Sequence, residues 1–400
     1  MPRPPDVIVV GGGLIGCLAA RALADDGRRV TLFEKGAGLG RRASTAAAGM
    51  LSPQMEWAEG MLVGGGGGAL ADAVRRTEAM LALCVAARER WAAFAAGLED
   101  ETGLPLHYRD EGTLVVALSD GEAADLEERA RDQRRHGLRA EWLEARAARD
   151  LEPGLAPDAR GALYLPDDRQ VDPVALMAAA VEALASRPGI RVETATAVTA
   201  VESSGGRVAG VTTAGRASAA EIVVLAAGAW SAGIGGLPRP LAVRPVKGQM
   251  AALRPIPMPI RHVVGGRSAY CVPRDDGRVV VGATVEEAGF DESVHPPAVA
   301  ALVAAVAAAV PALTAAPLES SWAGLRPGTP DDLPVLGEDP ARPGLLYATG
   351  HYRNGILLAP LTAELVSALA RGESPPVDLT PFSPARRALA EPIVQSSAPQ

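Results

Sequence analysis

The sequence predicts an α/β chain (α+β overall) in which a doubly wound domain is interleaved with a second domain built on an antiparallel sheet. A strand, a helix and a second strand open the chain around a glycine-rich turn at residues 11–16. Segments typical of strands and helices then alternate, and a run of strands and turns occupies residues 243–284. Because the two kinds of element interleave, we expect the first domain to be assembled from non-contiguous pieces.

The opening unit is the most regular part of the pattern. Residues 6–10 are a short apolar run that ends in three glycines, as expected of a buried parallel strand. A helix over residues 14–25 and a strand over residues 29–33 complete a βαβ unit. Residues 36–68 are rich in glycine, alanine and serine and contain five consecutive glycines at 64–68. They predict an irregular connection that is partly mobile.

The middle of the chain carries clear helix signals. Residues 71–98 have apolar side chains at helical spacing, and residues 121–136 form a heavily charged helix that should be solvated along most of its surface. A strand over residues 113–118 separates these two helices. Asp172 followed by Pro173 begins another helix, with an N-cap side chain and a proline at the first helical position.

Short strands and tight turns fill the second half. Strands are expected at residues 190–192, 197–201, 208–212 and 222–226. Hairpin turns are expected at residues 265–267 and 275–277. The last helix should span residues 356–370 and end at Gly372. The tail over residues 375–400 is rich in proline and serine, so its end is expected to be disordered.

The length of 400 residues is enough for two domains. The pattern assigns residues 1–70, 145–238 and 318–375 to the nucleotide-binding domain. Residues 71–144 and 239–317 are assigned to the second domain, and residues 376–400 to the tail.

Composition excludes several classes of function. The net charge is −8 and there is no long basic run, so no nucleic-acid partner is expected. The alanine-rich residues 298–310 are too short to cross a membrane, and the apolar residues 7–24 lack a cleavage site, so a cytoplasmic protein is expected. Cys17, Cys84 and Cys271 fit no metal-ligand spacing, which predicts buried thiols and no metal site.

The glycine-rich turn has the spacing of a Rossmann-like dinucleotide-binding motif. Gly11 makes the tight turn, Gly13 lets the backbone approach a pyrophosphate, and Gly16 lets helix and strand pack closely. Glu34, at the end of the next strand, would accept hydrogen bonds from a ribose hydroxyl and would repel a 2′-phosphate. The alternative is a glycine-rich turn without a ligand, but strand, helix, strand and acid all fall in place. The motif alone does not separate FAD from NAD.

Three segments of the chain, the first of which contains the glycine motif, indicate a protein family. They are residues 6–35, 43–50 (ASTAAAGM) and 350–360 (GHYRNGILLAP), with weaker matches at 246–249, 279–284 and 322–327. These segments resemble the D-amino-acid oxidase family of flavoproteins, and within it the glycine oxidases of thiamine biosynthesis. The resemblance covers nearly the whole chain except the tail.

The resemblance implies a non-covalently bound FAD and a set of residues around it. Residues implied near the adenosine and pyrophosphate are Leu14, Ile15, Glu34 and Lys35, with Val198 near the adenine. Residues implied along the cofactor are Ala43, Ser44, Ala48, Gly49 and Met50, and Gly228 is expected to join them. Residues implied beside the flavin ring are His351, Tyr352, Arg353, Asn354, Gly355, Ile356 and Leu357. There a glycine-rich loop opens a long helix, whose positive end would stabilise an anionic reduced flavin.

Three side chains are candidates for binding and aligning a substrate. Arg326 lies in the segment 324–327 (GLRP), just before a turn at residues 329–332, and its planar fork suits a carboxylate. The alternative is a surface arginine paired with Asp331 or Asp332. The resemblance places Tyr270 over the same carboxylate, although a tyrosine in a strand is often half-buried packing. It also implies that Arg353 contacts the substrate, through its backbone carbonyl to the amine; contact with the flavin C2=O or bracing of the loop is the alternative.

His351 and Met50 are two more residues expected near the substrate. His351 is not expected to act as a general base, because a neutral amine can lose its Cα hydrogen as hydride without one. Catalysis would then depend on alignment and on the field around the flavin. Met50 could cap a small pocket, although methionine is core filler by default.

The reaction implied by the resemblance is oxidative deamination of glycine. Hydride passes from Cα to FAD, O2 is reduced to H2O2, and the imine gives glyoxylate and ammonia or supplies the thiazole of thiamine. Related enzymes are tetramers. Sarcosine and small D-amino acids stay open as substrates, because one methylene is worth only about 1–3 kcal/mol.

Other classes stay open as well. One is a sarcosine oxidase, including an enzyme with covalent flavin; another is a D-amino-acid dehydrogenase that passes electrons to a quinone. A more distant one is a non-catalytic or tRNA-directed flavoprotein. That class needs a basic face, and the chain has 39 Lys plus Arg against 47 Asp plus Glu.

Overall fold

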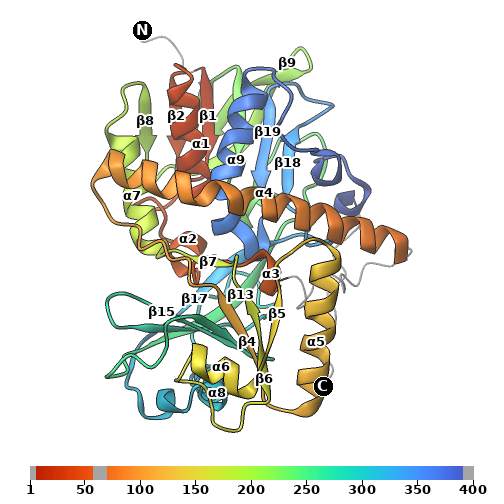
Figure 1. Ribbon diagram of the computed structural model, residues 1–400. Helices are drawn as coiled ribbons and strands as arrows, with labels where there is room; N and C mark the ends of the chain where they lie inside the picture. Colours follow the sequence, from red (N-terminus) through yellow and green to blue (C-terminus); the bar gives the residue numbers. More distant parts are fainter. Residues whose placement is uncertain (1–5, 57–69, 391–400) are drawn as a thin grey trace.

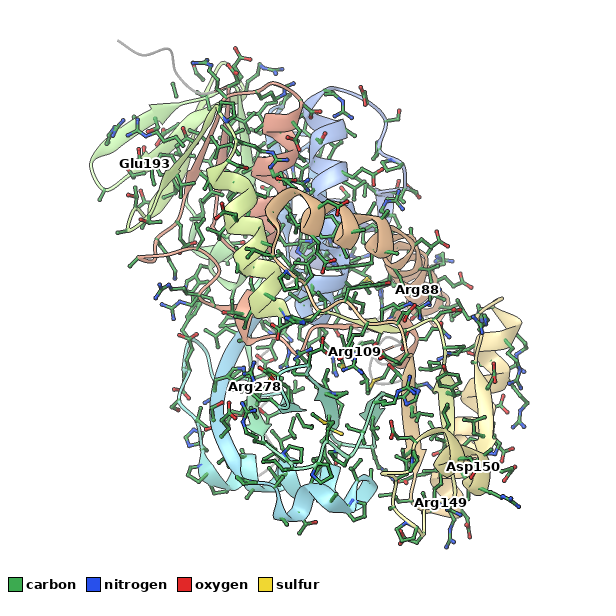
Figure 2. The ribbon with its side chains drawn as sticks, turned by 60° about the vertical axis from the view of Figure 1, so that its left-hand side comes forward. Arg88, Arg109, Arg149, Asp150, Glu193 and Arg278 are labelled. Atoms are coloured by element: carbon green, nitrogen blue, oxygen red, sulfur yellow. The ribbon has the colours of Figure 1, made fainter. Side chains whose placement is uncertain are left out.

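The computed structural model describes residues 6–56 and 70–390, and these form two domains, each built on one large sheet (Figure 1). Figure 2 shows the two domains side by side, with Glu193 on the first domain, Asp150 on the second and Arg109 between them. The expected α/β class with a doubly wound first domain is confirmed by the sheet order.

The first domain contains a six-stranded sheet in the order β18-β19-β12-β1-β2-β8. All neighbours are parallel except β18 and β19. The strands are β1 (Val7–Val10), β2 (Val30–Phe33), β8 (Ile190–Glu193), β12 (Ile222–Leu225), β18 (Val335–Glu338) and β19 (Leu345–Thr349). β1 and β2 are buried at every position because both faces of the sheet are covered, which explains their continuous apolar runs.

Helices cover one face of this sheet and a small sheet covers the other. The helices are α1 (Leu14–Asp25), α4 (Leu70–Thr102), α7 (Pro173–Ala185) and α9 (Gly355–Ala370). The small sheet contains β9 (Val198–Ser204), β10 (Arg207–Thr213) and β11 (Arg216–Ala219). Successive residues of β1 therefore join different cores: Val7 and Val9 pack with the helices, and Ile8 and Val10 pack against the small sheet.

The second domain contains an eight-stranded sheet in the order β17-β13-β16-β15-β14-β4-β6-β5. Its pairs are antiparallel except β14 with β4. The strands are β4 (Thr113–Ala117), β5 (Glu141–Glu144), β6 (Gly161–Leu165), β13 (Arg244–Leu253), β14 (Val263–Gly265), β15 (Tyr270–Pro273), β16 (Val279–Gly282) and β17 (Leu318–Gly328). The helices of this domain are α5 (Asp120–Arg135), α6 (Ala145–Leu151) and α8 (Pro296–Ala309).

Local signals in the sequence are reproduced closely. The side chain of Asp172 accepts hydrogen bonds from the N–H groups of Val174 (2.8 Å) and Ala175 (3.1 Å) at the start of α7. The turn after β15 contains Gly277 at φ +87°, and α9 ends before Gly372 at φ +72°. Both glycines adopt the left-handed backbone that such turns and helix ends require.

The described part of the connection expected over residues 36–68, which ends at residue 56, contains more regular structure than the sequence predicted. It contains α2 (Ala43–Ala46), β3 (Met50–Leu51) and α3 (Pro53–Glu56), and β3 pairs with β7 (Arg169–Gln170). The five-glycine run lies outside the described residues, as does the end of the tail. These elements were not predicted because they are very short and because their order comes from contacts with distant segments, such as the pairing of β3 with β7.

Four elements, α4, α6, β6 and β17, differ from the expected domain limits. α6 packs on β5 and β6 of the second domain, although its residues were assigned to the first. α4 packs on α9 and contributes Trp91 and Leu98 to the core of the first domain, although residues 71–144 were assigned to the second. β6 and β17 lie in the eight-stranded sheet, although their residues were assigned to the first domain. An amphipathic pattern shows that an element covers a core, and it carries no information about which core.

Among residues 6–56 and 70–390, no helix is both long and apolar enough to cross a membrane. The thiols of Cys17, Cys84 and Cys271 are buried, and burial raises the pKa of each above its ordinary value. The described residues contain no group of three or more metal-ligating side chains.

Candidate active site

A cavity of about 590 Å³ lies where the two domains meet. Its wall contains most residues expected from the sequence: Gly11, Gly13, Leu14, Ile15, Glu34, Lys35, Ala43, Ser44, Ala48, Gly49, Met50, Val198, Gly228, Tyr270, Arg326, His351, Tyr352, Arg353, Asn354, Gly355 and Ile356. Gly16 and Leu357 lie behind this wall. The structure therefore brings together residues separated by more than three hundred positions in the chain.

The glycines at the start of α1 allow a close backbone approach. A Cβ on Gly16 would lie 1.9 Å from the carbonyl oxygen of Gly11, and a Cβ on Gly11 would lie 2.4 Å from that of Ala226. Gly11 also adopts φ +111°, which side chains rarely allow. These contacts place the amino end of α1 against the cavity.

The amino end of α1 has the properties of an anion-binding site. The N–H of Leu14 donates to Oγ of Ser44 (2.9 Å). Within the described chain, no hydrogen bond engages the N–H groups of Gly13, Ile15 or Gly16. Because buried N–H groups need acceptors and a helix amino end favours negative charge, this end fits the pyrophosphate of a dinucleotide.

Glu34 fixes the turn beside this helix. Its carboxylate accepts hydrogen bonds from the N–H of Gly12 (2.7 Å) and from the N–H of Gly36 (2.6 Å). A carboxylate has about four acceptor positions, so capacity remains for ribose hydroxyls. Next to it, the ammonium of Lys35 lies 3.4 Å from the ring centroid of Trp230, and burial lowers the pKa of Lys35. The position of Glu34 at the cavity fits its expected role.

The loop before α9 forms the other end of the cavity. Gly350 (φ +72°) and Tyr352 (φ +45°) both have left-handed backbones, which turn the chain sharply between β19 and α9. His351 is 3% exposed, and its Nε2 lies 3.1 Å from Oγ1 of Thr362. Burial lowers the pKa of His351 to about 3, so the imidazole is neutral at physiological pH.

Arg326 and Tyr270 converge on one short segment after β16. Nη1 of Arg326 donates to the carbonyl oxygen of Thr284 (3.0 Å). The hydroxyl of Tyr270 lies over Gly282, where an added Cβ would come within 2.7 Å of it. Gly248 gives Arg326 its room, because a Cβ there would lie 2.3 Å from the guanidinium. Two different strands thus supply an arginine and a tyrosine that both line the cavity and both contact the segment 282–284.

The expected surface alternative for Arg326 is wrong. Among the described residues, no ion pair joins Arg326 to Asp331 or Asp332, and Asp331 instead pairs with Arg386 (2.8 Å). Arg326 lies on β17 at the cavity wall. Its guanidinium has five N–H donors, so donors remain for a carboxylate after the bond to Thr284.

The side chain of Arg353 has an acidic partner that sequence patterns did not indicate. Its Nε lies 2.6 Å from Oε2 of Glu56, at the end of α3. α3 is itself held by Asp168, which accepts from the N–H groups of Gln54 (3.4 Å) and Met55 (3.2 Å). Burial raises the pKa of Asp168 to about 7. Glu56 was missed because it lies in a connection without periodic pattern, and only the fold brings it beside residues 351–356.

Comparison with known proteins identifies the family. The family model described as FAD dependent oxidoreductase matches residues 6–369. The chain belongs to this family of FAD-dependent oxidoreductases. FAD is accordingly the cofactor, which decides between the two dinucleotides that the glycine motif left open. The open N–H groups of α1, the carboxylate of Glu34 and the long cavity fit this cofactor.

Relatives within the family are similar over nearly the full length. A protein named glycine oxidase from Geobacillus kaustophilus is 38% identical over 94% of this chain and 96% of its own. A bifunctional protein ThiO/ThiG from Synechocystis is 35% identical over 96% of this chain, which corresponds to 54% of that protein. The crystal structure of glycine oxidase from Geobacillus kaustophilus superposes with a TM-score of 0.86, at 36% identity, covering 96% of this chain and 98% of that one.

Replacement of Gly11 by alanine tests the phosphate end of the cavity. The added Cβ would meet backbone atoms of residues 226 and 227, so neither neighbour can move aside cheaply. We expect Gly11→Ala to weaken FAD binding by about tenfold or more, because backbone strain costs on the order of 1–3 kcal/mol. FAD content and dissociation constant, measured by flavin fluorescence, check this result.

The matched control is Gly97→Ala. Gly97 lies within α4, and an added Cβ meets nothing within 4 Å. Alanine is favoured over glycine there by about 0.5–1 kcal/mol, so this variant should retain full FAD content. Equal FAD affinity in the Gly11→Ala and Gly97→Ala proteins would contradict the assignment.

Buried His351 predicts a specific dependence of stability on pH. Its folded pKa of about 3 lies below the ordinary value of 6.5, so the unfolded chain binds more protons at pH values between them. Stability is therefore complete above pH 6.5 and falls as the pH falls. At pH 5 the loss is about 2 kcal/mol from this residue.

The variant His351→Gln should remove this dependence while it keeps a polar group near Thr362. Thermal midpoints measured at pH 7 and pH 5 should differ less for the variant than for the wild-type protein. An identical difference in both proteins would show that His351 does not resist protonation in the fold.

Proposed function

We propose that this protein oxidises glycine to the imine with FAD and O2, and that sarcosine and small D-amino acids are secondary substrates. The observation that carries the proposal is that Arg326 and Tyr270 both line the cavity and both contact the short segment 282–284. The relatives named glycine oxidase support the choice of substrate.

Binding is assigned to the carboxylate end of the amino acid. Arg326 supplies a planar pair of N–H donors, and its bond to Thr284 fixes the direction of the fork. The hydroxyl of Tyr270 supplies a further donor next to it. A carboxylate held at both oxygens leaves its α carbon in one orientation, which is the alignment that hydride transfer needs.

Room beside the α carbon is limited. The side chains of Met250 and Tyr270 meet over Gly282, and Met50 also lines the cavity. Bulk at these positions supports a short substrate such as glycine over one with a long side chain. Each methylene excluded contributes only about 1–3 kcal/mol, so small D-amino acids are expected to react more slowly rather than not at all.

No side-chain base is assigned to the reaction. His351 is held neutral by burial and bonded to Thr362, and Arg353 is engaged with Glu56. The reacting form is therefore the amino acid with a neutral amine, and the proton of the ammonium form is lost to solvent water rather than to a side chain. FAD, when bound, supplies the acceptor for the hydride from Cα and passes the electrons to O2 as H2O2. Water then converts the imine to glyoxylate and ammonia.

We also propose a pathway, a cellular location and an oligomeric state for the protein. The similarity to a bifunctional ThiO/ThiG protein supports supply of the imine to thiazole synthesis for thiamine. We infer a cytoplasmic homotetramer, as the resemblance to glycine oxidases implies. Neither a nucleic-acid nor a membrane partner is proposed.

The substrate is tested by H2O2 release from the purified yellow protein on glycine, sarcosine, D-alanine and L-alanine, compared by kcat/KM. We expect the highest value with glycine and none with L-alanine. Reduction of a dye by a D-amino acid without H2O2 would instead indicate a dehydrogenase. Yellow colour that stays with the denatured chain would indicate covalent flavin, and a band shift with tRNA at moderate salt would favour the tRNA-directed class.

The variant Arg326→Lys tests the carboxylate contact. Lysine keeps the charge but lacks the fork, and a charge-assisted hydrogen bond contributes about 1.5–3 kcal/mol. KM for glycine should therefore rise by about 10- to 100-fold, with FAD retained. Arg254→Lys is the control, because Arg254 pairs with Glu319 at the surface. An unchanged KM in Arg326→Lys would remove Arg326 from the site.

A further inference from the structure

Arg274 is a buried arginine that the proposed reaction does not use. It follows β15 directly, is 6% exposed, and is not among the residues of the cavity wall. Its Nη1 donates to the carbonyl oxygen of Val171 (3.1 Å) and its Nη2 to the carbonyl oxygen of Ala48. Its Nε lies 3.9 Å from a carboxylate oxygen of Asp172.

This arrangement is poorly explained by stability alone. Burial lowers the pKa of Arg274, so the fold works against its charge. Its one carboxylate partner is distant, and buried charges contribute little or nothing to stability compared with apolar groups of the same volume. The two carbonyl groups that Arg274 holds are therefore the feature that needs an explanation.

The two carbonyl groups belong to an incomplete strand pair. β3 and β7 pair with Met50 opposite Gln170, which places Gly49 opposite Val171 at the next position. The N–H of Val171 donates to the carbonyl oxygen of Gly49 (2.9 Å). The return bond, from the N–H of Gly49, is not formed, and Arg274 bonds the carbonyl oxygen of Val171. Gly49 adopts φ +74°, which turns its N–H away from the strand pair.

The bond to Ala48 fixes where that N–H points. A trans peptide is planar, so the carbonyl of Ala48 and the N–H of Gly49 lie on opposite edges of one unit. Arg274 holds the carbonyl edge from outside the cavity, while Ala48 and Gly49 both form cavity wall. The N–H edge therefore faces the cavity. Gly49 is buried, and no described acceptor takes this N–H, so a bound group must.

We propose that Arg274 is a positioning residue for the cofactor, which locks the Ala48–Gly49 peptide so that the N–H of Gly49 donates a hydrogen bond to bound FAD. This inference deepens the proposed function and rests on FAD as the cofactor, not on glycine as the substrate. Only glycine fits here, because a Cβ on Gly49 would lie 2.0 Å from the carbonyl oxygen of Val171.

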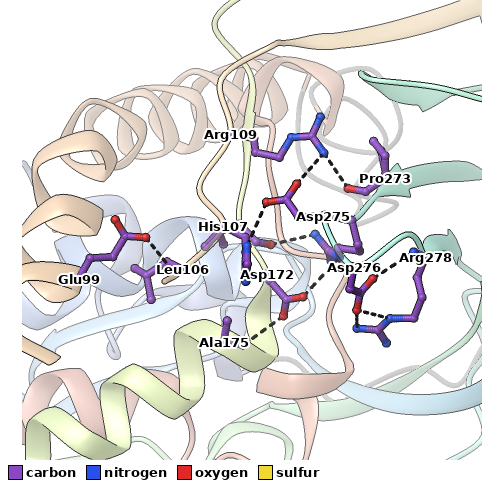
Figure 3. Close-up of polar contacts among 12 residues, drawn as sticks. Glu99, Leu106, His107, Arg109, Asp172, Ala175, Pro273, Asp275, Asp276 and Arg278 are labelled. Carbon is purple, nitrogen blue, oxygen red and sulfur yellow. Dashed lines mark hydrogen bonds and ion pairs between the residues drawn. The ribbon is translucent and has the colours of Figure 1, made fainter. Parts of the chain in front are cut away.

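The same hairpin connects the cofactor side with the substrate side. Tyr270, at the start of β15, lines the cavity and pairs with Gly282 at the end of β16, while Arg274 follows the opposite end of this strand pair. That end is anchored to the connection between α4 and β4, where Asp275 contacts His107 (3.0 Å) and Arg109 (3.3 Å) (Figure 3). A change at Arg274 should therefore act on the cofactor without removing a group that touches the amino acid.

The test compares Arg274→Met and Arg274→Lys with Arg278→Met in the full-length holoprotein. Arg278 lies on the same hairpin and bonds Asp276, two residues away, so its loss is a matched control (Figure 3). The measurements are the FAD dissociation constant, the visible absorption bands and the midpoint potential of bound FAD. None of them requires an amino acid, so they decide the inference even if glycine is not a substrate.

We expect Arg274→Met to weaken FAD binding at least tenfold, to shift the absorption bands and to make the potential more negative, because a lost donor destabilises the electron-rich reduced form. Arg274→Lys should show smaller shifts of the same sign, since one ammonium can still reach one carbonyl. Arg278→Met should match the wild type. If Arg274→Met has a lower thermal midpoint but wild-type affinity, bands and potential, Arg274 is only a clamp between domains.

Should Arg274→Met fail to fold, Arg274→Lys decides. A wild-type potential and FAD affinity in that variant would overturn the proposal, and a shifted potential with unchanged thermal midpoint would support it.

Discussion

The contact between Gly16 and the carbonyl of Gly11 is the constraint on which the rest of the structure depends. It lets α1 start directly at the end of β1, with its amino end and three open N–H groups against the cavity. Any side chain at Gly16 would push the helix off the sheet and with it α9, which packs on α1. The amino end of α1 and the loop before α9, which form the two ends of the cavity, therefore both depend on this one contact between backbones. Apolar burial elsewhere cannot replace it.

Backbone groups and side chains form different parts of the binding site. At the phosphate end, N–H groups and a helix dipole supply the positive field, and Glu34 is the one charged group engaged with the turn. At the opposite end, charged side chains make most of the contacts described. They are Arg326 at the wall, Arg353 with Glu56, and Arg274 behind the Ala48–Gly49 peptide. This difference follows from the ligands, since the pyrophosphate of a dinucleotide offers several oxygens to backbone N–H groups, while a small amino acid offers one carboxylate and one amine.

Local features of the chain could be predicted because they arise from a few adjacent residues. The glycine spacing around α1, the cap by Asp172 and the turn at Gly277 each follow from backbone conformations that only certain residues adopt. Arg326 and Tyr270 were expected at the cavity, and the structure places both there. Glu56 and Arg274 could not be predicted, because all their partners named above lie more than one hundred residues away. The sheet to which β6 and β17 belong was likewise hidden, since strand pairing over such distances leaves no periodic signal.

The interleaved order of the strands has a consequence for how the protein is made. β12 and β19 complete the central sheet, and α9 completes its helical face, yet they are synthesised long after β1 and α1. On the ribosome all strands of the second domain emerge before α9, whereas the nucleotide-binding domain stays incomplete until about residue 370 has emerged. FAD binding is therefore one of the last steps of biogenesis. A chain that ends before β19 leaves the edge of β12 unpaired, and this edge is then open to chaperones and proteases.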